Sequence, residues 1–155
     1  MKSVLALLAL ALLAAGCTTP APTGAAAHLV LPAPAVGKNP AWSPTSEEIA
    51  RIEKDVNNLL ANPDQRVFGL GQNLPPHPFS EYIVRFTAAG PLDNRFVMGL
   101  AALPSSVPRE EFLSATTPDT RAVELSTSPA NFQFIYNLKQ NRLVEIRFNK
   151  QPGQP

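Results

Sequence analysis

Apolar residues recur every three or four positions over residues 46–61, the spacing of one face of an α-helix. The apolar set is Ile49, Ile52, Val56, Leu59 and Leu60. Thr45 stands before this run and Glu48 follows it three positions later, which is the spacing of a capping box. Asn62 and Pro63 end the pattern. The passage predicts one amphipathic helix, with Trp42 packing where the helix begins.

From residue 81 the period of the pattern changes to two, which is typical of β-strands with one buried face. Residues 90–94 supply glycine, proline, aspartate and asparagine for a turn between two such runs. A hairpin centred near residue 91 places both apolar sets on one face. It gives three opposed pairs: Phe86 with Phe96, Val84 with Met98, and Tyr82 with Leu100.

The alternation returns over residues 132–148, where a second hairpin is expected. A two-residue turn there would oppose an apolar set to a polar one, so we expect an odd loop at residues 140–142 or an equivalent bulge. The resulting pairs are Leu138 with Val144, Tyr136 with Ile146, and Phe134 with Phe148.

Three shorter passages have weaker patterns. Residues 66–70 fit a short strand, and residues 121–126 fit another. In residues 104–120, Ser106 and Pro108 suit the start of a short helix. A loop or an edge strand fits residues 104–120 equally well.

These elements predict an α+β fold, in which one N-terminal amphipathic helix packs on an antiparallel sheet of about five strands. A small β-sandwich or half-barrel with one helix is the alternative. Residues 44–150 then form a single domain, and residues 151–155 form a disordered tail.

Proline, alanine and threonine dominate residues 17–43, which favours a tether over a folded segment. Extended polyproline II rises about 3.1 Å per residue, so this tether would reach up to roughly 80 Å. Residues 28–31 form an apolar patch within it. We interpret the patch as part of the linker; the alternative is an edge strand added to the domain or to a partner.

The first residues have the pattern of an export signal. Lys2 precedes an apolar run over residues 4–15, which is too short to span a bilayer. The run ends in Leu13-Ala14-Ala15-Gly16-Cys17, and this stretch resembles the lipobox of bacterial lipoproteins.

The resemblance implies removal of residues 1–16 as a signal peptide and acylation of Cys17, so that the membrane is one partner. In that family the residue after the cysteine influences sorting, and Thr18 favours the outer membrane, facing the periplasm, over the inner membrane. The alternatives are an ordinary signal peptide that leaves a free thiol, or an uncleaved anchor.

Charge and cysteine content exclude several classes of function. The chain has 13 basic and 12 acidic side chains, and loss of Lys2 with the signal would make them equal. This balance gives no electrostatic case for binding nucleic acid. Cys17 is the only cysteine, so the domain has no disulfide to stabilise it and no thiolate metal site.

We expect no catalysis, no cofactor and no metal site. His28 lies in the tether and His77 between prolines, which leaves no evident nucleophile and base pair. The first hypothesis is therefore a non-catalytic accessory module that binds another cell-envelope protein.

A module for a small apolar ligand or lipid is the second hypothesis, with Phe86, Phe96, Phe134 and Tyr136 lining a pocket. The third is an inhibitor or immunity protein against a secreted hydrolase. Such a protein would present a loop at residues 74–79, which includes His77 and Phe79.

Overall fold

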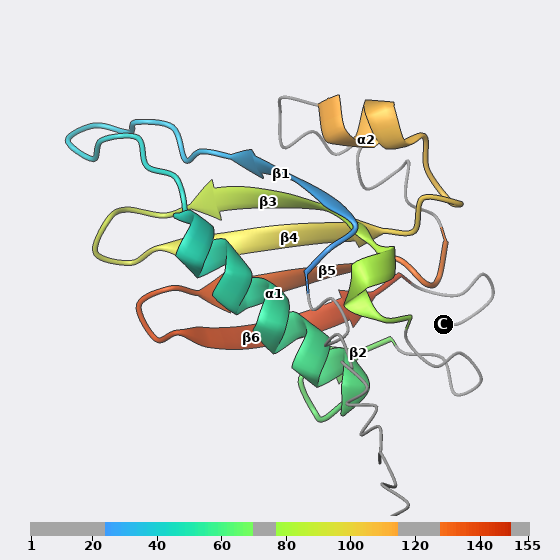
Figure 1. Ribbon diagram of the computed structural model, residues 1–155. Coiled ribbons are helices and arrows are strands. Elements are labelled where there is room, and N and C mark those ends of the chain that lie inside the picture. Colours follow the sequence, from blue (N-terminus) through green and yellow to red (C-terminus); the bar gives the residue numbers. More distant parts are fainter. Residues whose placement is uncertain (1–23, 70–76, 115–127, 150–155) are drawn as a thin grey trace, which may run out of the picture.

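The computed structural model of the chain describes residues 24–69, 77–114 and 128–149. These residues form one six-stranded sheet in the order β1-β3-β4-β5-β6-β2, with helix α1 lying diagonally across one face (Figure 1). The expected α+β class is confirmed. Two details were wrong: the sheet is mixed and has six strands, and the helix is not the N-terminal element because β1 precedes it.

Helix α1 spans Ser46–Ala61 and begins with the expected capping box. The Glu48 amide donates to Thr45 Oγ1 at 3.2 Å, and the Thr45 amide donates to Glu48 Oε2 at 2.9 Å. All five residues of the predicted apolar stripe are buried against the sheet. Helical periodicity and capping therefore identified this element correctly.

Strands β3 (Ile83–Ala89) and β4 (Phe96–Ala102) form the first hairpin, but in another register than expected. Phe86 lies opposite Gly99, and Phe96 lies opposite Ala89. The shift turns the small residues of β4 toward α1 and leaves Met98 on the outer face. The reason is steric, because the rings of neighbouring strands already fill the space over Gly99.

Strands β5 (Phe132–Asn137) and β6 (Arg142–Phe148) form the last hairpin. Its register shifts between Ile135 and Tyr136, so the expected irregularity is confirmed. The expected pairs were wrong by about two residues. The observed ones are Tyr136 with Leu143, Phe134 with Ile146, and Phe132 with Phe148.

Strand β1 (Ala27–Leu31) occupies a segment that we expected to be linker. It pairs in parallel with β3, from Ala27 opposite Ile83 to Leu31 opposite Thr87. The apolar patch is thus an edge strand of the domain. Val30 packs on the main core, which explains why this short segment is held to the sheet.

The remaining elements complete the two sides of the sheet. Strand β2 (Val67–Phe68), in the passage where a short strand was expected, pairs in parallel with β6 at the opposite edge. A 3-10 turn, η1, spans Phe79–Glu81. Helix α2 (Arg109–Ser114) lies in residues 104–120, where a short helix was one of the expected alternatives. It covers one end of the outer face through Phe112.

Several expectations fall outside the described residues. They concern the lipobox with Cys17, the strand at residues 121–126 and the tail at residues 151–155. Within the described ranges, neither helix is long and apolar enough to cross a bilayer.

Candidate binding groove

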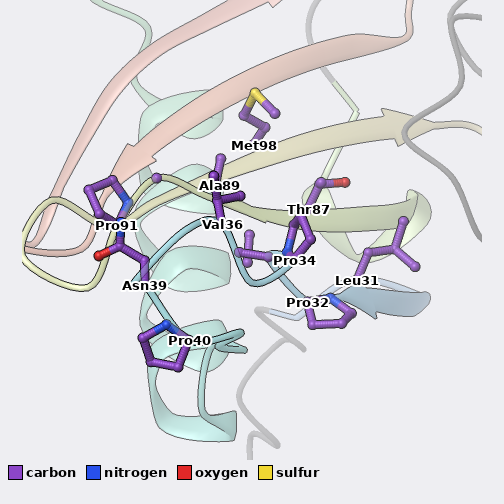
Figure 2. A pocket seen from close by; sticks show the side chains of 13 residues that line it. Leu31, Pro32, Pro34, Val36, Asn39, Pro40, Thr87, Ala89, Pro91 and Met98 are labelled. Atoms are coloured by element: carbon purple, nitrogen blue, oxygen red, sulfur yellow. The ribbon is translucent and has the colours of Figure 1, made fainter.

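An apolar groove opens where the pairing of β1 with β3 stops. The last pair is Leu31 with Thr87, whereas β3 continues to Ala89. Pro32 and Pro34 follow Leu31, and prolines have no amide with which to continue a ladder. The chain therefore separates from β3 and leaves a hollow of about 670 Å³ (Figure 2).

The lining of this groove is mainly apolar. The apolar side chains include Leu31, Pro32, Pro34, Val36, Pro91 and Met98, and Asn39 and Thr87 are polar. Val36 is 66% exposed and Met98 is 43% exposed. The groove is therefore an open surface that keeps apolar side chains in water, a feature that marks interaction sites.

One wall of the groove is a short hairpin over residues 33–42. Backbone bonds join Ala33 to Trp42 and Val36 to Asn39, and Gly37 turns between them with φ +60°. The Trp42 indole N–H donates to the Gly90 carbonyl at 2.8 Å, which ties this wall to the turn after β3. The wall is thus fixed before any ligand arrives.

A second set of contacts connects this wall to the helix. The Arg95 guanidinium lies 5.3 Å from the centre of the Trp42 ring and donates to Glu48 Oε1 at 2.9 Å. Trp42 is buried near the start of α1, as expected. The groove therefore rests on the sheet, the turn after β3 and the first turn of α1.

The aromatic residues expected to line a pocket lie elsewhere. Phe79, Phe86, Phe134 and Tyr136 are buried in the core between α1 and the sheet. The rings of Phe86 and Phe134 meet edge to face at 5.9 Å. The structure brings these residues together as packing, and none of them lines the groove.

The other two candidate residues are also outside the groove. Phe96 is half-buried on the outer side of β4, opposite Ala89 and Asn137. His77 is exposed, and its Nδ1 lies 2.8 Å from Glu81 Oε2.

Sequence reasoning missed the residues that do form the groove. Two signals were present: the apolar patch at residues 28–31, and the prolines directly after it. Met98 was assigned to the inner face because the register of β3 and β4 was wrong. The correct register makes Met98 part of the groove floor.

Glu53 is a further residue that the pattern did not single out. It lies on α1 and is 9% exposed, and its Oε1 accepts the Ala25 amide at 3.3 Å. The same oxygen is 3.1 Å from His28 Nδ1. Glu53 therefore fastens the start of β1 to the helix, which positions the strand that leads into the groove.

Two buried tyrosines carry the clearest pKa shifts. Burial raises the pKa of Tyr82 to about 12, and its hydroxyl donates to the Ala130 carbonyl at 3.0 Å. Burial and the hydrogen bond to Asp55 Oδ2, at 2.9 Å, also raise the pKa of Tyr136. Both shifts keep the phenols neutral, which suits structural hydrogen bonds.

Metal binding finds no support in residues 24–69, 77–114 and 128–149, where no group of three or more His, Cys, Asp or Glu is placed to hold an ion. No family model, curated protein or solved structure matches the chain. The groove is therefore the structural feature that bears most directly on function.

Proposed function

We propose that the protein is a lipid-anchored, non-catalytic module of the bacterial cell envelope that binds a segment of another envelope protein. The open apolar groove between the hairpin 33–42 and the end of β3 is the observation that carries this proposal. The anchor is acylated Cys17, in the outer membrane facing the periplasm.

The shape and chemistry of the groove favour a protein segment as its occupant. Sites for small molecules enclose most of the ligand and place a few polar groups around it. This groove is open along its side and is lined largely by proline and aliphatic side chains. Its fixed wall means that little conformational entropy is lost on binding.

The position of β1 also limits where the partner lies. Strand β1 begins at Ala27, only ten residues beyond Cys17 (17 to 27). A fully extended chain covers at most about 3.5 Å per residue, so at most roughly 35 Å would separate the lipid from the sheet. This reach is less than half of that expected from a long tether, and it supports a partner that lies close to the same membrane.

The test places a photo-crosslinking residue at position 36 of the lipidated protein within cells and identifies the proteins that it captures. Position 54 is the control, since Lys54 is exposed on the solvent side of α1. We expect one recurrent envelope protein at near-equal amount from position 36 and none from position 54. The same bystanders from both positions would contradict the proposal.

A small apolar ligand or lipid is the second candidate, and the groove volume favours it. About 670 Å³ falls within the ordinary range of ligand pockets, roughly 300–1,000 Å³. Native mass spectrometry of the purified protein separates the two candidates. A retained small molecule would favour the ligand, and a clean mass would favour the protein segment.

The third hypothesis, an inhibitor that presents residues 74–79, has less support. Phe79 is fully buried in the core and cannot be part of a presented surface. Residues 70–76 lie outside the part of the chain that the structure describes.

A further inference from the structure

Strand β1 has one edge that pairs with β3 and one that faces outward. It stands at one end of the strand order, and β3 is its only partner among the strands described. The Ala26 amide donates to the Tyr82 carbonyl at 2.8 Å, which sets the direction of the backbone groups. By the alternation of an extended strand, the backbone groups of Ala27, Leu29 and Leu31 point to the open edge.

Within the part of the chain that the structure describes, this edge lacks the features that usually prevent strands from adding to a sheet. Native edge strands are short, charged, bulged or interrupted by proline. Residues 27–31 read Ala-His-Leu-Val-Leu, without a charged Lys, Arg, Asp or Glu and without proline. The His28 ring is turned toward Glu53, and the prolines begin only at Pro32.

The opposite edge of the sheet makes a useful comparison. Strand β2 has only two residues, and the guanidinium of Arg147 lies 5.7 Å from the centre of the Phe68 ring. A short strand beside a charged side chain is a protected edge. The lack of protection is therefore particular to β1.

We propose that an extended segment of the partner protein adds to β1 as a further strand and continues into the groove. This inference rests on the proposed function and specifies its binding mode. Leu31 belongs to both the edge and the groove, so one segment can reach both. Backbone pairing supplies affinity in such complexes, and side-chain pockets supply specificity.

The chemistry of the edge defines the partner segment. It is extended and uncharged, it has free amides at the positions that pair, and it carries an apolar side chain where it enters the groove. A second copy of this chain fits less well. Of the described residues, antiparallel pairing of two β1 strands about Leu29 brings Gly24 and Ala25 of the other copy toward the groove, and these small residues fill little of it.

The test compares two substitutions at position 29, each with the photo-crosslinking residue at position 36 in the lipidated protein. Leu29→Pro removes the outward amide, whereas Leu29→Ala keeps it. Loss of backbone pairing at this point should lower the crosslinked fraction about tenfold in L29P and less than about twofold in L29A. Pro on the outward side of an edge strand leaves the ladder with β3 intact, so both variants should melt near the parent temperature.

A crosslinker placed at position 29 itself gives a second measurement that does not depend on the folding of L29P. It should capture the same partner segment. Retention of the position 36 crosslink in a folded L29P variant, or no capture from position 29, would overturn strand addition while the groove proposal stands. Equal losses in L29P and L29A, or crosslinks to a second copy, would also overturn it. Absence of any partner from position 36 in the parent would instead be a failure of the proposed function.

Discussion

Gly99 shows how one residue sets the register of two strands. A Cβ atom built at Gly99 would lie 1.9 Å from Cζ of Phe134, whose ring is fully buried. The ring therefore occupies the place of a side chain on β4. Only glycine can stand opposite Phe86 at this point, and this choice turns Met98 outward into the groove.

We expect Gly99→Ala to lower the free energy of unfolding by about 3 kcal/mol, because overpacking a closed core forces rings and backbone apart. Denaturant unfolding measures the change. Gly37→Ala is the matched control, since nothing lies within 4 Å of its Cβ and only its positive φ is unfavourable, at about 1 kcal/mol. Phe134→Leu should restore part of the loss in G99A. A G99A variant as stable as the parent would contradict this packing.

Tyr82 and Tyr136 are the only tyrosines of the chain, so phenol ionisation reports directly on the core. We expect almost no tyrosinate absorbance at 295 nm up to about pH 10 in the folded protein, because both pKa values are raised. In denaturant both should titrate near the ordinary value of about 10. A phenol with a raised folded pKa stabilises the fold fully below the unfolded pKa. That stability is lost as the pH rises through the folded pKa, about 12 for Tyr82.

Tyr136→Phe is the control for this titration, since it should halve the signal in denaturant and leave the folded baseline flat. A tyrosinate signal near pH 10 in the folded protein would show that a phenol is exposed to solvent.

At the scale of elements, β1 depends on α1 as well as on β3. Glu53 accepts the Ala25 amide and lies beside His28, so one carboxylate holds the start of the strand. The edge proposed to receive a partner segment is therefore positioned by the helix.

Glu53→Ala should loosen β1 selectively. Loss of these hydrogen bonds, worth about 1–2 kcal/mol, should speed amide exchange at His28 and Val30 about tenfold and leave β4 unchanged. Hydrogen exchange followed by NMR measures this. Glu47→Ala is the matched control, because Glu47 is exposed in the first turn of the same helix. Equal acceleration in β1 and β4 would show a global effect, which would contradict a local role.

The sequence predicted the position of helix α1 better than it predicted the registers of the strands. Helix α1 was correct because periodicity and capping agree locally, from Thr45 to Asn62. Strand registers were less predictable because they depend on contacts between distant residues. Nothing near Gly99 in sequence reveals that the ring of Phe134 will cover it.

The candidate site was harder still to predict from sequence. Aromatic residues such as Phe86 suggested a pocket, but large rings on an inner sheet face form the core itself. The groove arises where Pro32 and Pro34 lead the chain away from β3. The prolines are visible in the sequence, but the sequence does not show that a groove forms between them and β3.

At the scale of the whole molecule, α1 covers one face of the sheet and α2 covers one end of the other face (Figure 1). The groove lies at the opposite end, where the pairing of β1 with β3 stops. Strand β1 runs from Ala27, beside α2, to Leu31 at the groove, so the chain that precedes β1 enters the sheet at the end away from the groove.

Cys17→Ser should move the protein from the membrane pellet to the soluble envelope fraction, because the proposed anchor is the acyl group on Cys17. Fractionation followed by immunoblotting measures this. L29A, which keeps Cys17, is a control that should stay in the pellet. A C17S protein that remains in the pellet after a carbonate wash would contradict lipid anchoring.

The parallel edge strands also determine when the chain can fold. Strand β1 pairs with a strand that begins 56 residues later in the sequence (27 to 83), and β2 pairs with residues 79 positions later (67 to 146). Helix α1 likewise packs mainly on strands that follow it in the chain. A chain that emerges from its N-terminus therefore holds β1 without its strand partner until β3 appears, and β2 without its partner until β6 appears, and such distant pairings form slowly. For the proposed envelope protein, this delay would keep the chain extended while it crosses the membrane.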